Sequence, residues 1–220
     1  RTRKTNFSIQ IKDLIIGLHS KYILPKVVDF CCATKPIRKQ REKVVPLCKG
    51  IVLEIGAGSG LNFPFYDPNK VKKLYALEPD REMIKLARRE TKETPFKIIY
   101  LQEYAENISL KDNSVDTILL TYSLCTIPDP ISALKEMKRT LKSNGHLIYC
   151  EHGMAPETSI KKWQDRLNPI NSYFCGGCNL NRDISRLIVE SGFKIKKLET
   201  MYLPGTTKLI GYNYWGIAVI

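Results

Sequence analysis

At 220 residues the chain is long enough for one well-buried domain and too short for two full ones, and no apolar run approaches the ~18 residues of a membrane-spanning helix. A composition of 43% hydrophobic and 26% charged residues excludes disordered and fibrous classes, and seven cysteines without a regular framework favour a reducing, cytoplasmic compartment. The net charge of +13 does not by itself choose among nucleic acid, an anionic membrane and an acidic partner.

The positive charge is concentrated in residues 1–50, which contain twelve Lys or Arg residues and three acids. Apolar residues recur there at near-helical spacing, so residues 9–45 are predicted to form two or three short helices, broken near Pro25 and Pro36. Two interpretations stay open for residues 1–48. They cover a pocket as a basic helical lid, or they also make peripheral contact with a membrane. Nucleic acid is the weaker interpretation because interleaved stacking aromatics are absent.

The most informative motif is VLEIGAGSG at residues 52–60. Its apolar start predicts a buried strand at residues 50–55, and its three glycines allow a ligand to approach the backbone at the carboxyl edge of a sheet. The dinucleotide fingerprint is G-x-G-x-x-G, whereas here the spacing is G-x-G-x-G and Glu54 precedes it. An acid at this place would repel a pyrophosphate but attract the ammonium group of an amino-acid ligand. The motif therefore disfavours a nicotinamide oxidoreductase.

Strands and helices then alternate, which predicts a parallel sheet with right-handed crossovers. The predicted strands are residues 72–77, 97–101, 115–121 and 146–150, and the predicted helices are residues 81–91, 131–141 and 183–191. Residues 155–180 show few clear regular elements. Residues 193–202 and 213–220 are β-rich and are joined without a helix, so these last two strands are predicted to be antiparallel.

A second acid, Glu78, ends the second predicted strand eighteen residues after Gly60. Doubly wound folds hold ribose hydroxyls at this place. Bare backbone, an ammonium-binding acid and a ribose-binding acid together indicate a nucleoside joined to an amino acid, which is the form of S-adenosylmethionine. A glycine turn in an unrelated α/β protein is the alternative.

Residues 52–151 resemble a class I S-adenosylmethionine-dependent methyltransferase, through VLEIGAGSG, ALEPD (76–80), EYAENISLKDNSVD (103–116) and LKSNGHL (141–147). The resemblance implies an α/β, Rossmann-like fold with a seven-stranded, mostly parallel sheet, a reversed last strand and helices on both faces. The methyltransferase domain would span residues 49–220, behind the lid of residues 1–48. S-adenosyl-L-methionine is the implied cofactor and S-adenosyl-L-homocysteine the implied product.

The resemblance also implies a set of cofactor-binding residues near the glycine turn, the second strand, the adenine loop and the fourth strand. They are Glu54, Gly56, Ala57, Gly58, Gly60, Glu78, Pro79, Glu103, Tyr104, Ala105, Glu106, Thr121 and Tyr122. Many relatives have Asp where this chain has Tyr104. Tyr104 can instead stack on the purine. Glu103 or Glu106 would then accept a hydrogen bond from the amino group of the adenine.

Further segments are similar to one subgroup, namely TKPIRKQREKVVPL, LNFPFY, LCTIPDP, CEHG and CGGCNLNRD. That subgroup contains the methyltransferase-like seven proteins, membrane-associated thiol S-methyltransferases, and bacterial relatives. The similarity implies a small or lipophilic acceptor, with a thiol sulfur as the best-supported class. Because fold and cofactor do not fix the acceptor, a lipid or quinone acceptor and a non-catalytic cofactor-binding protein stay open.

Catalytic candidates are expected after the fourth and fifth strands. His152 lies within Glu151-His152-Gly153 at the predicted pocket rim and is a candidate base, which a thiol acceptor needs because the thiolate is the nucleophile. Alternatively, Glu151 fixes this histidine for the structure of the loop. Tyr122 orients the acceptor or walls the cavity, and Cys125 is expected to be a small buried residue.

Cys175 and Cys178 form a C-x-x-C pair that resembles half of a zinc site. His152 or Cys150 would have to complete it, whereas structural zinc usually draws on a second closely spaced pair. We therefore expect no metal, and we interpret the two central glycines as a tight turn near the acceptor. Arg182 is expected to have a structural role.

Overall fold

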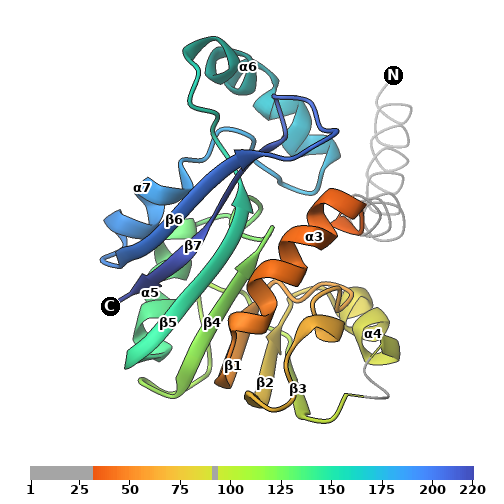
Figure 1. Cartoon of the computed structure of the whole chain (residues 1–220), viewed down its shortest axis with the longest axis vertical. Helices are drawn as coiled ribbons and strands as arrows, with labels where there is room; N and C mark the ends of the chain where they lie inside the picture. Colours follow the sequence, from red (N-terminus) through yellow and green to blue (C-terminus); the bar gives the residue numbers. More distant parts are fainter. Residues whose placement is uncertain (1–31, 91–93) are drawn as a thin grey trace, which may run out of the picture.

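The computed structural model describes residues 32–90 and 94–220. Seven strands within these ranges form one sheet in the order β3-β2-β1-β4-β5-β7-β6 (Figure 1). They are β1 (Gly50–Ile55), β2 (Val71–Leu77), β3 (Lys97–Leu101), β4 (Val115–Thr121), β5 (Leu141–His152), β6 (Lys194–Tyr202) and β7 (Tyr212–Val219). β7 runs antiparallel to both of its neighbours, and the first five strands pair in parallel. The predicted Rossmann-like sheet with a reversed last strand is confirmed.

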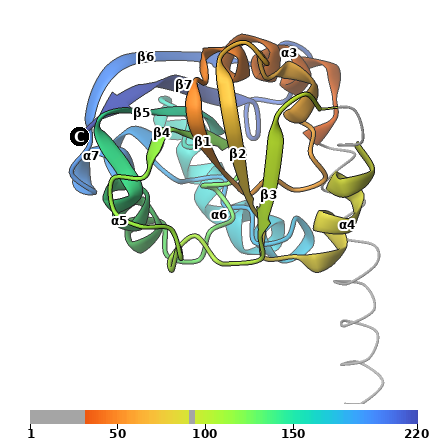
Figure 2. The ribbon, with the colours of Figure 1, turned by 90° about the horizontal axis from the view of Figure 1, so that it is seen from below.

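Helices cover both faces of this sheet (Figure 2). They are α3 (Lys35–Val44), α4 (Arg81–Glu90), α5 (Pro130–Thr140), α6 (Thr158–Phe174) and α7 (Ile184–Glu190), with short 3-10 turns η2 (Val45–Leu47) and η3 (Phe63–Phe65). α3 and α4 contribute to the core on one face, and α5 and α7 to the core on the other. Among the described helices, none combines the length and apolarity needed to cross a membrane.

Side-chain alternation along β1 divides its residues between the two cores. Leu53 and Ile55 join the core under α5 and α7, whereas Val52 joins the core under α3 and α4. Because successive strand residues point to opposite faces, Glu54 lies on the same side as Val52. Because side chains alternate between the two faces, the carboxylate of Glu54 lies beneath α3 and not at the end of the strand.

Two sequence predictions about elements were wrong. Residues 158–174 form the long helix α6, in which Pro169 is accommodated, where few regular elements were expected. The second error concerns the boundary between α5 and the fifth strand, which was predicted to begin at residue 146. The helix ends at Thr140, and β5 begins at once with an irregular stretch before pairing becomes regular at His146. By contrast, the predicted break near Pro36 is confirmed, because α3 begins at Lys35 and Pro36 lies in its first turn, where its missing N–H removes no helical hydrogen bond. Residues 1–31 of the predicted lid lie outside the described ranges.

Candidate active site

The glycine turn follows β1 directly and adopts backbone angles that side chains disfavour. Gly56, Gly58 and Gly60 have φ values of +66°, +55° and +89°. A Cβ atom at Gly56 would lie 2.6 Å from the Cβ of Ser123, and one at Gly60 would lie 2.6 Å from the ring of Phe63. The turn therefore presents bare backbone at the carboxyl edge of the sheet, as the motif predicted.

Glu78 joins this turn to the end of β2. Its Oε2 accepts a hydrogen bond from the N–H of Gly58 (2.9 Å), and its Oε1 accepts one from the N–H of Asp80 (3.0 Å). Burial raises its pKa above the usual range, although these two bonds act in the opposite direction. Each carboxylate oxygen keeps a second lone pair, so Glu78 can also accept from a ribose hydroxyl. Pro79 is partly buried beside it.

Glu54 does not lie at the mouth of the turn, which corrects the expectation that it meets a ligand ammonium group. It is completely buried, with Oε1 accepting from Asn62 Nδ2 (2.7 Å) and Oε2 from the Tyr66 hydroxyl (2.8 Å). Burial raises its pKa to about 7, although the hydrogen bonds from Tyr66 and Asn62 and the charge of Arg41 act to lower it. Strand alternation is the physical reason, because it places this side chain under α3.

Arg41 of α3 is a buried cation that sequence reasoning missed. Its Nη1 donates to Asn62 Oδ1 (2.7 Å) and Thr121 Oγ1 (2.9 Å), and its guanidinium lies 5.5 Å from the ring centroid of Tyr122. Arg41 also lines a cavity of about 500 Å³ that reaches Gly60. Its Nε is buried and has no partner among the described residues. The helical spacing of Arg41 and Val44 was the available signal, because it places both on one face.

Two acids of the expected adenine loop accept hydrogen bonds from within the protein. Glu103 accepts from the N–H (3.0 Å) and hydroxyl (2.5 Å) of Ser109, and Glu106 accepts from the N–H of Asp129 (3.2 Å). The side chain of Ala105 is buried in the core, as is that of Ala57 in the glycine turn. Tyr104 is 65% exposed, so its ring is accessible to a purine.

Tyr122 follows β4 directly, in a conformation that is rare for a bulky residue, with φ at +54°. Its hydroxyl donates to Asn213 Oδ1 (2.8 Å) and accepts from Cys150 Sγ (3.6 Å). Its side chain lines a second cavity, of about 200 Å³, together with His152. These contacts fit the wall role for Tyr122, because its hydroxyl is already engaged within the protein.

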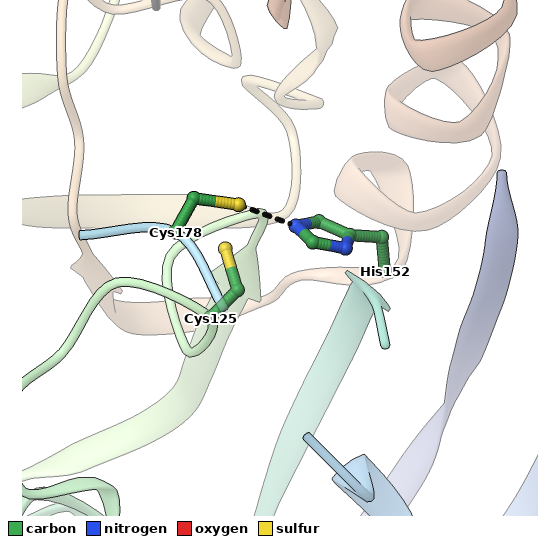
Figure 3. A group of neighbouring side chains, drawn as sticks. All are labelled: Cys125, His152 and Cys178. Atoms are coloured by element: carbon green, nitrogen blue, oxygen red, sulfur yellow. Dashed lines mark hydrogen bonds between the residues drawn. The ribbon is translucent and has the colours of Figure 1, made fainter. Parts of the chain in front are cut away.

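His152 shares this second cavity with two cysteines from distant segments (Figure 3). His152 Nε2 lies 3.0 Å from Cys178 Sγ, and these two atoms and Cys125 Sγ all lie within 4.8 Å of one another. Hydrogen bonds from Cys125 and His152, partly opposed by burial, lower the pKa of Cys178. Burial lowers the pKa of His152, but the bond to Cys178 outweighs it and the net shift is upward. Cys125 is buried, as expected, yet it is also part of a polar cluster.

Glu151 holds the loop after β4, whereas the sequence suggested that it fixes His152. Its Oε1 accepts from the N–H groups of Ser123 (2.9 Å) and Leu124 (3.0 Å). Burial raises the pKa of Glu151 to about 7, although these two bonds act to lower it. His152 Nδ1 is buried and has no partner in the described part of the chain. The ring is therefore positioned by its contact with Cys178.

The CGGCNLNRD segment clamps the loop after β4. The backbone N–H and Nδ2 of Asn179 both donate to the carbonyl oxygen of Cys125 (2.9 and 3.0 Å). Arg182 donates to the carbonyl oxygens of Leu124 and Ile127, and Asn171 Nδ2 donates to that of Cys178 (2.7 Å). The expected structural role of Arg182 is confirmed, and both cysteine backbones are fixed.

We expect Glu54→Gln to change how stability depends on pH. The pKa of Glu54 in the folded state, near 7, exceeds the usual value of 4.5. Between these two pH values the folded chain therefore binds more protons than the unfolded chain. The contribution of Glu54 to stability falls as pH rises through this window. The unfolding free energy of the wild type minus that of the variant should therefore fall by up to about 3 kcal/mol between pH 5 and pH 8. Urea unfolding at several pH values measures this difference, and a constant difference would contradict the assignment.

Comparison with known proteins shows which family has this sequence and this fold. The family model described as "Methyltransferase domain" matches residues 53–149. The chain is 31% identical to thiol S-methyltransferase TMT1B of Rattus norvegicus over 76% of this chain and 70% of the relative. It is 28% identical to thiol S-methyltransferase TMT1A of Homo sapiens over 79% and 72% of the two chains.

The fold is likewise found in solved structures. A SAM-dependent methyltransferase of Thermotoga maritima superposes with a TM-score of 0.64 at 20% identity, covering 92% of this chain and 98% of that one. The strand order with its reversed β7, the glycine turn joined to Glu78, the matched family model and the relatives all agree. The chain belongs to the class I S-adenosylmethionine-dependent methyltransferases.

Proposed function

We propose that this methyltransferase acts on the thiol sulfur of a small lipophilic acceptor. The observation that carries the proposal is the position of His152 in the wall of the 200 Å³ cavity, beside mainly apolar side chains such as Ile37, Leu180 and Ile210. β1 and β4 are neighbours in the sheet, so Tyr122 at the end of β4 lies at the same sheet edge as the glycine turn. An acceptor in this cavity would be next to the cofactor site.

The chemistry of methyl transfer explains why an imidazole matters there. S-adenosylmethionine supplies, when bound, a methyl group on a sulfonium whose departure leaves a neutral thioether. The protein must align the acceptor and exclude water, and for a thiol it must also favour the thiolate. His152 is the group in this cavity suited to promote loss of the thiol proton. The two thiol S-methyltransferases among the relatives support this acceptor class.

For the cofactor, we infer that Glu78 accepts from the ribose hydroxyls and that the backbone of the glycine turn supports the amino-acid end. Arg41 lies beside this turn and lines the larger cavity, so its guanidinium suits the carboxylate of the methionine moiety. Tyr104, exposed on the adenine loop, would stack on the purine.

Glu78→Gln should weaken S-adenosylmethionine binding by about 1.5–3 kcal/mol, which is roughly 10- to 150-fold in Kd. The amide would present a donor to a backbone N–H and would lose one charged acceptor for ribose. Isothermal titration calorimetry measures the change, with Glu82→Gln on the exposed side of α4 as the matched control. Equal affinity in the two variants would show that the ribose assignment is wrong.

The acceptor class is tested with three compounds of one shape, benzyl mercaptan, benzyl alcohol and benzylamine. Formation of S-adenosylhomocysteine should depend on the mercaptan and stay at background with the other two. Product with a quinol or a lipid headgroup but none with thiols would replace the thiol proposal. Cofactor binding without product from any acceptor would favour the non-catalytic alternative.

His152→Gln should lower turnover of benzyl mercaptan by about 100-fold or more, a typical contribution of a group that assists proton transfer. Cofactor affinity should not change. Thiophenol ionises more readily, so its turnover should fall much less if His152 acts on the thiol proton. His146→Gln, at the other end of the regular part of β5, is the matched control. Equal losses with both thiols would assign His152 a structural role.

A further inference from the structure

We propose that Cys125, His152 and Cys178 form a binding site for a thiophilic divalent cation, zinc being the ion that fits these donors best. Two thiolate sulfurs and one imidazole nitrogen are the ligands that zinc prefers in proteins. The three residues come from the loop after β4, the end of β5 and the loop after α6, so the fold brings them together from separate parts of the chain.

The distances between the donor atoms suit one shared ion. Bond lengths of 2.0–2.3 Å at tetrahedral angles place ligand atoms about 3.6–3.8 Å apart. His152 Nε2 and Cys178 Sγ are 3.0 Å apart, and the three donor atoms lie within 4.8 Å of one another. The ligand separations that a tetrahedral ion requires lie between these two observed values, so small side-chain rotations would bring the donor atoms to the required distances. Figure 3 shows the two sulfurs and the imidazole ring converging on one region.

The backbones that carry these donors are already fixed by other polar side chains. The carbonyl oxygen of Cys125 accepts two hydrogen bonds from Asn179, and that of Cys178 accepts one from Asn171. Asn168 in turn donates to Asn179 Oδ1 (3.0 Å). A site with held ligands loses little conformational freedom when an ion binds, which favours affinity.

The number of donors indicates a reactive site and not a structural one. Structural zinc is usually held by four protein ligands, whereas catalytic zinc keeps three and leaves a position for water or substrate. The three donors line the 200 Å³ cavity, so an open position on the ion would face the space assigned to the acceptor. Cys178 of the C-x-x-C pair joins Cys125 and His152 in the cluster, and Cys175 is not one of its three donors.

The role of the ion rests on the proposed function. The acceptor thiol loses its proton to solvent, and its sulfur occupies the open position as a thiolate. That sulfur then donates an electron pair to form the new S–CH₃ bond, while the bond from the methyl group to the sulfonium breaks and its electron pair stays on the departing thioether. The methylated product is a neutral thioether, a weak ligand that leaves readily. In this form of the reaction His152 promotes ionisation of the thiol as a ligand of the ion.

Cobalt(II) provides a spectroscopic test that does not depend on turnover. The full chain, kept reduced with a phosphine and freed of metal by a chelator, is titrated with cobalt and then with zinc. One equivalent of cobalt should give sulfur-to-metal charge-transfer absorption and the strong visible bands of a four-coordinate site, and zinc should displace it. Cys125→Ser and Cys178→Ser should each weaken zinc binding by more than the roughly 10- to 100-fold that loss of an outer-shell partner costs.

Cys48→Ser is the matched control, since Cys48 is buried in the core under α3 and α4 and should leave metal binding unchanged. Absence of the charge-transfer band, or equal zinc affinity in all three serine variants, would overturn the site. Benzyl mercaptan should shift the cobalt bands and benzyl alcohol should not, and an unshifted spectrum would overturn binding of the acceptor to the ion. A normal cobalt spectrum without thiol-dependent S-adenosylhomocysteine would instead refute the proposed function and leave the metal site standing.

Discussion

The cofactor side of the molecule depends on a buried carboxylate and a buried guanidinium that are joined through an amide. Asn62 donates to Glu54 and accepts from Arg41, so neither charged group is left without a partner in the core. Burying a lone charge is costly, and breaking such an arrangement on one side leaves the other uncompensated. Glu54 precedes the glycine turn and Asn62 follows it, so the network also closes the turn from both ends.

A second set of hydrogen bonds holds the side of the molecule proposed to bind the acceptor. Asn179 and Arg182 bind backbone carbonyl groups of the loop after β4, and Glu151 binds the N–H groups of the same loop. Tyr122 lies between the two halves, with the guanidinium of Arg41 near its ring and Asn213 on its hydroxyl. The cofactor and acceptor regions are thus connected through one side chain whose backbone is held in an unfavourable conformation.

The sequence predicted those features that have a local signal. Apolar runs and turn residues predict the strands at residues 97–101 and 115–121 and the antiparallel final pair. The structure has them at these positions. α6 was missed because Pro169 and the nearby glycines suggested irregular structure, whereas the rest of the helix tolerates one missing N–H. The motif gives the position of Glu54 in the chain but not the face of the strand on which it lies, so the sequence predicted a ligand contact where the structure buries the carboxylate.

The contacts that build the site depend on tertiary structure in a way that sequence spacing does not show. Cys125 and Cys178 are far apart in the chain, and the more obvious partner of Cys178 by spacing was Cys175. Arg41 belongs to a basic segment that the sequence predicts to be a lid, and its burial requires α3 to lie over the ends of β1 and β4. Such pairings become visible once the strand order is known.

The place of β7 in the sheet has a consequence for how the protein is made. β7 is the last of the seven strands along the chain, yet it lies between β5 and β6. Until the ribosome has released residues 212–219, β5 presents an unpaired edge and β6 has no neighbour in the sheet. Asn213, which holds both Tyr122 and Cys150, arrives with this strand. The wall of the 200 Å³ cavity is therefore completed only once β7 has been added, and nascent chains need protection from edge-to-edge association until then.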